Sequence, residues 1–559
     1  MRDLIIVLQY AALCFKKFKF YFQKIKNSPI ANHFGIVYNI GKGSYIISGI
    51  SVKEKNMKKT ILFILSMLLT FTSLFSLSAC DIFDDDKCNH DNTEESCLYC
   101  GVTDEKYFSF TLLEDGTYSV SAKDKNNMPA LVIIPDTYKG VKVTSIPDSA
   151  FYRCNEITGV KIGDNVVTIG YSAFANCYNL TDLVLGKSIT SIEGSAFNDC
   201  NSKLFSGYDH LLYVRSLDNP YAILIGAGSF QKHYTQYEIH EDTELIASGA
   251  MQECRNITEL TIPKKVVSIG SLSFSYCENL ETVNILSDRI AYIGKMAFYC
   301  CSDISEITIP RKVKYIGEEA FSYCNLDSIK GGNLDYPVIG NCLIERKTKT
   351  LMAGSNNSNI PYGVTSIANG AFSHRAEMTN IKIPKSVTYI GERAFSLCKS
   401  LESIEIPDSV TTIEHLAFDN CESLSRVIIG KNASSIGERV FVSCRRLTSI
   451  EVDSKNEYFK SIDGILYTKD GKTLVQYAAG RKDATFVIAD GVTTIGKSAF
   501  YTCDNLESIV IPKSVKKIES TAFSYKPINI YYKGNEFQWN MIEIAQDLRL
   551  VNIHYNYTP

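Results

Sequence analysis

Apolar residues recur along most of the chain in one fixed order, which predicts short strands separated by turns. From Leu180 the order is L-x-x-L-x-L, then a turn, then an apolar return that ends at Phe197. Side chains two positions apart share one face of a strand, so each L-x-L predicts a short strand with a buried face. A phenylalanine, replaced once by methionine, marks the same point of each unit: Phe151, Phe174, Phe197, Met251, Phe274, Phe298, Phe321, Phe372, Phe395, Phe418, Phe441, Phe500 and Phe523.

The spacing of these phenylalanines defines a repeat of about 23 residues, as between Phe372, Phe395 and Phe418. One unit of this length is too small to bury its own apolar face, but stacked copies bury a continuous core. We therefore expect a solenoid in which the strands form one parallel sheet. The phenylalanines should form a ladder inside it.

The units resemble the treponemal-type leucine-rich repeats of the BspA-like surface protein family, and the resemblance covers about residues 130–525. It is specific because some dozen copies keep both the register and the residue types. It implies a leucine-rich-repeat solenoid with its parallel β-sheet on one face. It also implies a place at the bacterial surface, often with a role in adhesion or in contact with a host or matrix.

Three gaps between successive phenylalanines exceed one repeat, and each contains an apolar run, a polar turn and a second apolar run. Such a pattern predicts a β-hairpin that projects from the solenoid or widens it, and Asp470-Gly471 is a typical hairpin turn. The C-terminal segment holds the single tryptophan, Trp539, which either packs in a cap or forms an exposed ligand platform. The predicted domains are an N-terminal β cap at 107–140, repeat blocks at 141–203, 240–329, 361–454 and 489–526, hairpin inserts at 204–239, 330–360 and 455–488, and a C-terminal cap at 527–559.

The segment before the repeats has the layout of an export signal. From Met57, two lysines precede an apolar run from Ile61 to Leu77, and Cys80 follows it closely. The last four residues of this segment resemble the bacterial lipobox, which implies a lipoprotein signal peptide at 57–80 and a lipid attached to Cys80. An uncleaved signal-anchor helix is the alternative, because about 17 apolar residues can just span a bilayer. We interpret residues 1–56 as an over-extended N-terminus, and the lysines before the apolar run place the C-terminal part outside the cell.

The linker at 81–106 contains a small group of potential metal ligands. Cys88, His90, Cys97 and Cys100 supply four ligands, the number that a closed structural zinc site uses. The alternative is a tethered linker with a local disulfide.

The chain has 18 cysteines, and most of them occupy one position of the repeat, three residues after the phenylalanine. A buried cysteine behaves as a small apolar residue, so we expect a ladder of free thiols that fills space in the core. Disulfides between neighbouring coils remain the alternative. The repeat cysteines are Cys154, Cys177, Cys200, Cys254, Cys277, Cys301, Cys324, Cys398, Cys421, Cys444 and Cys503.

Composition and motifs argue against an enzyme and against nucleic-acid binding. Lys and Arg total 58 against 61 Asp and Glu, so the chain has no strong charge of either sign. The eight histidines show no repeating offset, and no glycine-rich phosphate loop or serine elbow is present. A row of equivalent cysteines singles out no nucleophile with a neighbouring base. We expect no catalytic site and no certain cofactor.

The outward position of each strand gives a mixed row without a run of aromatic or basic residues, so neither sugar stacking nor a polyanion is favoured. We therefore expect a lipid-anchored surface protein that binds host, matrix or surface proteins or polymers, through the row or through the inserts. A structural envelope protein without a dedicated ligand is the alternative. The row consists of Val184, Thr261, Asn284, Thr308, Lys382, Glu405, Ile428, Glu451 and Val510.

Overall fold

The computed structural model describes residues 36–38, 45–47, 106–227, 233–523, 528–545 and 551–558. The chain forms two compact units, residues 1–93 and 94–559. In the first unit, β1 (Ile36–Tyr38) pairs antiparallel with β2 (Tyr45–Ile47). The second unit contains the repeats. Across all these described ranges, no helix combines the length and the apolar character that crossing a membrane requires.

A single coil shows how the repeat sequence makes its local structure. In β16 (Glu259–Ile262) exposed and buried residues alternate, so the two apolar side chains point into the core. Pro263 follows and ends the strand, and the chain turns into the two-residue strand β17 (Ser268–Ile269). Gly270 comes next, where an added Cβ would lie 2.5 Å from the backbone nitrogen of Ser248 in the preceding coil. Glycine is therefore required by the close approach of the two backbones.

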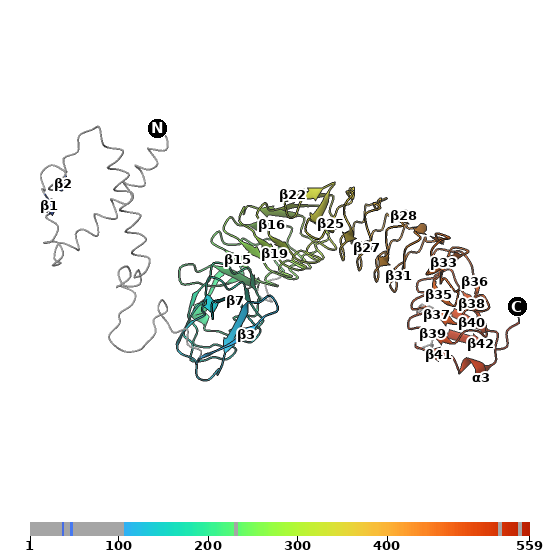
Figure 1. The fold of residues 1–559 in the computed structure, drawn as a ribbon, viewed down its shortest axis with the longest axis horizontal. Coiled ribbons are helices and arrows are strands. Elements are labelled where there is room, and N and C mark those ends of the chain that lie inside the picture. Colours follow the sequence, from blue (N-terminus) through green and yellow to red (C-terminus); the bar gives the residue numbers. More distant parts are fainter. Residues whose placement is uncertain are drawn as a thin grey trace, which may run out of the picture. The chain divides into compact units, whose positions relative to one another are not determined.

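The longer strands of successive coils pair in parallel, as β16 does with β18, which confirms the predicted parallel sheet. Figure 1 shows these coils following one another in chain order within the second unit. The row consists of β5 (Leu131–Ile133), β8 (Gly159–Lys161), β10 (Asp182–Val184), β16, β18 (Thr282–Ile285), β20 (Glu306–Ile309), β22 (Ser328–Gly331), β28 (Ser403–Ile406), β30 (Arg426–Ile429), β32 (Ser449–Val452), β36 (Thr485–Val487), β38 (Ser508–Ile511), β40 (Ile528–Tyr532) and β42 (Val551–His554). It is divided into separate sheets, because β10 and β16, β18 and β20, β22 and β28, and β32 and β36 do not pair with each other.

A second parallel row, which the sequence did not predict, is made by the two-residue strands. Most of these strands place one isoleucine in the core, as Ile269 and Ile293 do, whereas Ile436 and Ile544 are partly buried against it. Two residues are too few for a periodicity to be visible in the sequence. The row consists of β9 (Thr168–Ile169), β11 (Ser191–Ile192), β15 (Leu245–Ile246), β17, β19 (Tyr292–Ile293), β21 (Tyr315–Ile316), β26 (Ser366–Ile367), β27 (Tyr389–Ile390), β29 (Thr412–Ile413), β31 (Ser435–Ile436), β37 (Thr494–Ile495), β39 (Lys517–Ile518) and β41 (Glu543–Ile544).

The phenylalanines form the predicted internal ladder. Phe395 is fully buried, and its ring stacks on those of Phe372 and Phe418 with centroids 5.0 Å apart on both sides. The planes are nearly parallel, at 3° and 1°. Similar stacks join Phe151, Phe174 and Phe197, then Phe274, Phe298 and Phe321, and finally Phe500 and Phe523.

The phenylalanine turn also explains the cysteine of the repeat. Around Phe418, Leu416 and Asn420 have left-handed backbone with φ of 56° and 55°. After this turn the thiol of Cys421 donates a hydrogen bond to the carbonyl of Phe395 in the preceding coil, at 3.2 Å. The described cysteines are all free thiols. The same thiol contact is made by Cys177, Cys200, Cys277, Cys301, Cys324, Cys398 and Cys444.

Each predicted insert contains a three-stranded antiparallel meander. In the first, β12 (Phe205–Tyr208), β13 (Leu211–Val214) and β14 (Ile223–Ala227) pair in order, and β14 then pairs in parallel with β15. Asp209 and His210 turn between β12 and β13 with positive φ, the geometry of a two-residue hairpin loop. The other two meanders are β23 (Val338–Ile339), β24 (Cys342–Glu345) and β25 (Thr350–Gly354), and β33 (Phe459–Ile462), β34 (Ile465–Thr468) and β35 (Thr473–Gln476).

Different structural elements cover the two ends of the array. At the N-terminal end, β3 (Phe108–Leu112) and β4 (Tyr118–Ala122) form a hairpin, and β4 pairs with β7 (Val141–Ile146), the neighbour of β6 (Thr137–Tyr138). At the C-terminal end lies the short helix α3 (Glu536–Trp539). Trp539 is buried beside Tyr532, with ring centroids 5.3 Å apart, so it packs in the cap rather than forming an exposed platform.

Candidate functional site

The loop between β13 and β14 distinguishes the first insert from the other two. It spans residues 215–222, whereas the matching turns span only 346–349 and 469–472. The loop follows the 3-10 turn η3 (Ser202–Leu204) and β12 along the insert. It lies against the coil that carries β15, since the meander joins that coil in parallel. The extra residues are therefore positioned beside the solenoid.

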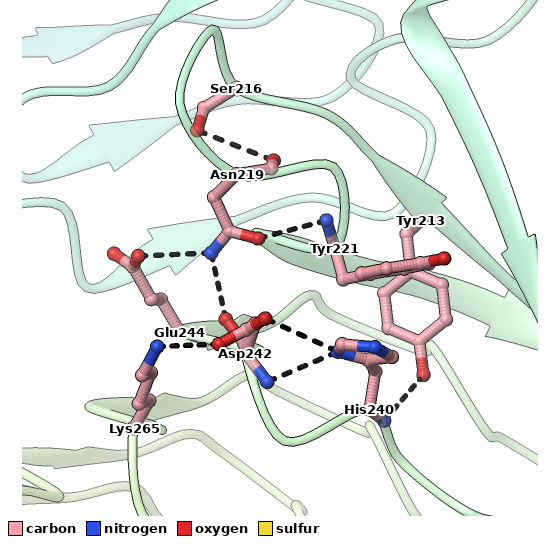
Figure 2. Close-up of polar contacts among 8 residues, drawn as sticks. All are labelled: Tyr213, Ser216, Asn219, Tyr221, His240, Asp242, Glu244 and Lys265. Carbon is pink, nitrogen blue, oxygen red and sulfur yellow. Dashed lines mark hydrogen bonds and ion pairs between the residues drawn. The ribbon is translucent and has the colours of Figure 1, made fainter.

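Asn219 fixes this loop to the following coil. Its Nδ2 donates to the carbonyl of Asp242 at 2.8 Å and to Oε1 of Glu244 at 3.1 Å. Its Oδ1 accepts the backbone N–H of Tyr221 at 2.9 Å. Figure 2 shows all three contacts converging on the one amide group. Because every polar atom of this side chain is used, Asn219 sets the position of the loop.

A layer of aromatic side chains packs against the base of the loop. The ring of Tyr221 stacks on His240 at 3.7 Å, and Tyr208 meets the same imidazole edge-on at 4.8 Å. The hydroxyl of the buried Tyr213 accepts the backbone N–H of His240 at 3.1 Å. Burial raises the pKa of Tyr213 to about 12, so its hydroxyl keeps its proton at neutral pH. These contacts pack the base of the loop against the coil that carries His240.

A pocket of about 340 Å³ lies between the loop and the two blocks of repeats that it separates. This volume is at the lower end of the range for small-molecule sites, and it suits one side chain or one sugar unit. Val184 and Leu185 line it from the last coil of the first block. Residues 216–220 line it from the loop, and Asp242, Glu244 and Lys265 line it from the following coils.

The lining of the pocket is acidic. Lys265 forms an ion pair with Asp242, which holds the pKa of that carboxyl below its ordinary value and raises the pKa of the lysine. Among the described residues, Asp218 forms no ion pair, and Glu244 accepts only the amide of Asn219. The lining thus carries three carboxylates and one ammonium, with aliphatic walls. Such a site can hold a cationic or hydroxyl-bearing group, and it contains no nucleophile with a base beside it.

Of the residues that the sequence singled out, Val184 of the predicted outward row lines this pocket. Cys80, Cys88, His90, Cys97 and Cys100 all lie outside the described residues. Within the described ranges, no group of three or more His, Cys, Asp or Glu side chains is arranged to hold a metal ion. The lipid attachment and the zinc site therefore stay predictions.

The predicted outward row is corrected at one position. Thr261, Thr308, Lys382 and Glu405 are exposed as expected, but Val510 is 1 % exposed. All four residues of β38, which lies near the C-terminal cap, are buried, so this strand has no exposed face.

The sequence reasoning missed the pocket because its residues come from three separate segments. The only local signal was Asp218-Asn219-Pro220, since Asn-Pro is typical of a turn. That signal places a loop, but it does not show that Asp242 and Lys265 lie beside it.

Comparison with known families supports the repeat assignment. The sequence profile of a family described as "BspA type Leucine rich repeat region" matches residues 134–208, 224–348, 353–462 and 480–545, with six copies. Comparison with curated proteins finds no significant match.

Several solved structures are similar along most of the chain. A leucine rich cell surface protein from Faecalibacterium prausnitzii is 25% identical, with 79% of this chain and 97% of that chain covered and a TM-score of 0.32. A leucine-rich repeat protein from Eubacterium ventriosum is 17% identical, with 81% and 94% covered and a TM-score of 0.34. The pneumococcal vaccine antigen PcpA is 16% identical, with 80% and 98% covered and a TM-score of 0.35.

Proposed function

The chain belongs to the BspA-type leucine-rich repeat family, and from this premise we propose that it is a cell-surface protein that binds a macromolecule. The expected partner is a host, matrix or neighbouring surface protein, or a polymer. Repeat solenoids present extended surfaces to such partners, and each block of coils here displays polar side chains outward. Binding, and not catalysis, is the activity we assign.

The observation that carries the proposal is the pocket beside the first insert. Its loop is held in place by Asn219 before any partner arrives, so binding does not have to order it. Its carboxylates and aliphatic walls suit a lysine, an arginine or a hydroxyl-rich unit of the partner. The pocket is too small for a whole partner, so it anchors one group of the partner while the neighbouring coils contribute further contact area.

Saturable capture tests this proposal. Purified chain on beads is exposed to mucus, matrix and surface extracts, and captured material is titrated back for affinity. We expect Asn219→Ala and Glu244→Gln each to weaken binding about tenfold, which corresponds to ~1.4 kcal/mol. Glu402→Gln, which changes an exposed carboxylate far along the chain, should bind like the parent. If all three variants capture the partner as well as the parent does, the binding site lies elsewhere on the array. If the parent shows no saturable capture, a structural envelope protein is favoured.

We further propose that a lipid on Cys80 anchors the mature chain outside the cell. The lysines and the apolar run before Cys80 support export, and the lipobox resemblance supports acylation. Cells grown with a labelled fatty acid should incorporate label into the parent and none into Cys80→Ser. Label in Cys80→Ser, or an unlabelled parent, would reject the anchor without affecting the binding proposal.

A further inference from the structure

The coil of Phe321 lies directly against the coil of Phe372, although the second insert separates them in the sequence. The hydroxyl of Ser322 donates to the carbonyl of Gly370 at 3.0 Å, and the N–H of Tyr323 donates to the hydroxyl of Ser373 at 2.9 Å. In an ordinary pair of coils the corresponding N–H donates to a backbone carbonyl, as Cys300 does. We call this contact the second joint, and it depends on side chains where coils within a block use the backbone.

A buried arginine lies in the second joint, at the position that cysteine occupies in the other repeats up to residue 503. Arg375 is 0 % exposed, and its Nε donates to the carbonyl of Gly354 at 2.6 Å. Its Nη1 donates to the carbonyl of Ser373 at 2.7 Å and also to that of Cys324, across the joint. Burial lowers the pKa of Arg375 to about 10, so the guanidinium stays charged at neutral pH. No carboxylate among the described residues pairs with it.

The residue before this arginine is a histidine. His374 is half-buried, with left-handed backbone at φ 59°. Burial, followed by the charge of Arg375, holds the pKa of His374 below its ordinary value. The other groups that face it are Lys399 from the next coil, Asp303 from the preceding block and the backbone of Tyr323. Protonation would thus add a cation beside two others, and only the backbone of Tyr323 and the carboxylate of Asp303 would favour the charged imidazole.

We infer that the second joint is an acid-sensitive hinge, in which a proton on His374 favours separation of the Phe321 coil from the Phe372 coil. While the joint is closed, the buried guanidinium of Arg375 repels a proton on the half-buried imidazole of His374. When the joint opens, water reaches both groups and their repulsion falls. Since the open joint binds the proton more tightly, acid shifts the equilibrium toward opening as the pH falls below about 6.5.

Hydrogen exchange of the full chain at about pH 7.5 and about pH 5 measures this equilibrium, after correction for the intrinsic exchange rate. The reporting amides are those of Tyr323 and Ala376, which donate across the joint to Ser373 and to Asn325. We expect their protection to fall severalfold in acid. The coil of Phe441 lies against the coil of Phe500 at the third insert, where the amide of Ser443 donates to the hydroxyl of Thr502 at 3.0 Å. This amide should keep its protection, because Thr502 occupies the position there that His374 occupies in the second joint.

Two variants make the inference falsifiable. His374→Asn, which tolerates the left-handed backbone, should abolish the acid-induced loss of protection at Tyr323 and Ala376. Asp303→Asn, which removes the facing carboxylate, should enlarge that loss. The inference is overturned if the parent shows no loss, if His374→Asn shows the same loss, or if Ser443 loses protection equally.

Discussion

Replacing Phe395 by alanine removes one ring from the middle of a stacked segment of the phenylalanine ladder. The side chain is fully buried, and rings on both sides lie 5.0 Å away with nearly parallel planes. A core phenylalanine replaced by alanine costs about 3–5 kcal/mol, and each aromatic pair contributes about 0.5–1.5 kcal/mol beyond burial. Because Phe395 has two such partners, we expect a loss near the upper end, about 5 kcal/mol.

Phe441 provides an internal comparison within the same block. It ends the segment, with the ring of Phe418 at 5.6 Å on one side as its stacking partner. Phe441→Ala should therefore cost less than Phe395→Ala by about 1 kcal/mol, the value of one stack. Tyr171→Ala, which changes an aromatic residue that is 61 % exposed, should cost under about 0.5 kcal/mol.

Urea unfolding followed by circular dichroism measures these losses, with hydrogen exchange of block amides as a second probe because repeat arrays can unfold in parts. The ranking is the critical result. If Phe395→Ala unfolds at the same urea concentration as the parent, or if Phe441→Ala costs as much as Phe395→Ala, the stacked ladder does not carry the stability assigned to it.

Three further changes test other contacts. Arg375→Met leaves buried carbonyls without a donor and should lower the free energy of unfolding in urea by about 3–5 kcal/mol. The control Arg346→Met, at an exposed turn, should lower it by under about 0.5 kcal/mol. Equal losses in the two variants would contradict the role of the buried guanidinium. Burial raises the pKa of Cys421 well above its ordinary value, so this thiol should react with iodoacetamide at neutral pH only after the chain unfolds. Peptide mapping of the labelled protein measures this reaction, and labelling of Cys421 in the folded chain would contradict its burial. Glu451 accepts two hydrogen bonds from Arg426, and these lower the pKa of its carboxyl. The contribution of this ion pair to the free energy of unfolding should therefore be present above about pH 4.5 and disappear as the pH falls through the lowered pKa. Urea unfolding of Glu451→Gln at several pH values should lack that part of the loss of stability in acid.

The repeat itself was predictable because the same few positions of each coil meet the core. Phe395 and Ile404 recur in register with their counterparts, and burial of each follows from stacking alone. The second strand row was not predictable, since a pair such as Ser268–Ile269 carries no periodicity. The turn around Phe418 was hidden for another reason. Its left-handed positions are held by Leu416 and Asn420, and not by the glycines that usually signal such a backbone.

The pocket and the second joint depend on contacts between segments that are distant in the sequence. Asn219 is 25 residues from Glu244, and Arg375 is 51 residues from Cys324. Arg375 did leave one local trace, because it interrupts an otherwise regular column of cysteines. A break of this kind indicates a changed environment, but the identity of the partners requires the fold.

The way the inserts enter the solenoid has a consequence for how such a protein can change over generations. The third strand of each meander, as with β14 beside β15, continues the row of two-residue strands, so an insert extends the stack while the exposed part of its loop lies outside the shared core. Exposed loop residues such as Leu217 and Asp218 can therefore be exchanged with little effect on the coils on either side. The exposed surface of such a protein can therefore vary within a lineage while its scaffold stays the same.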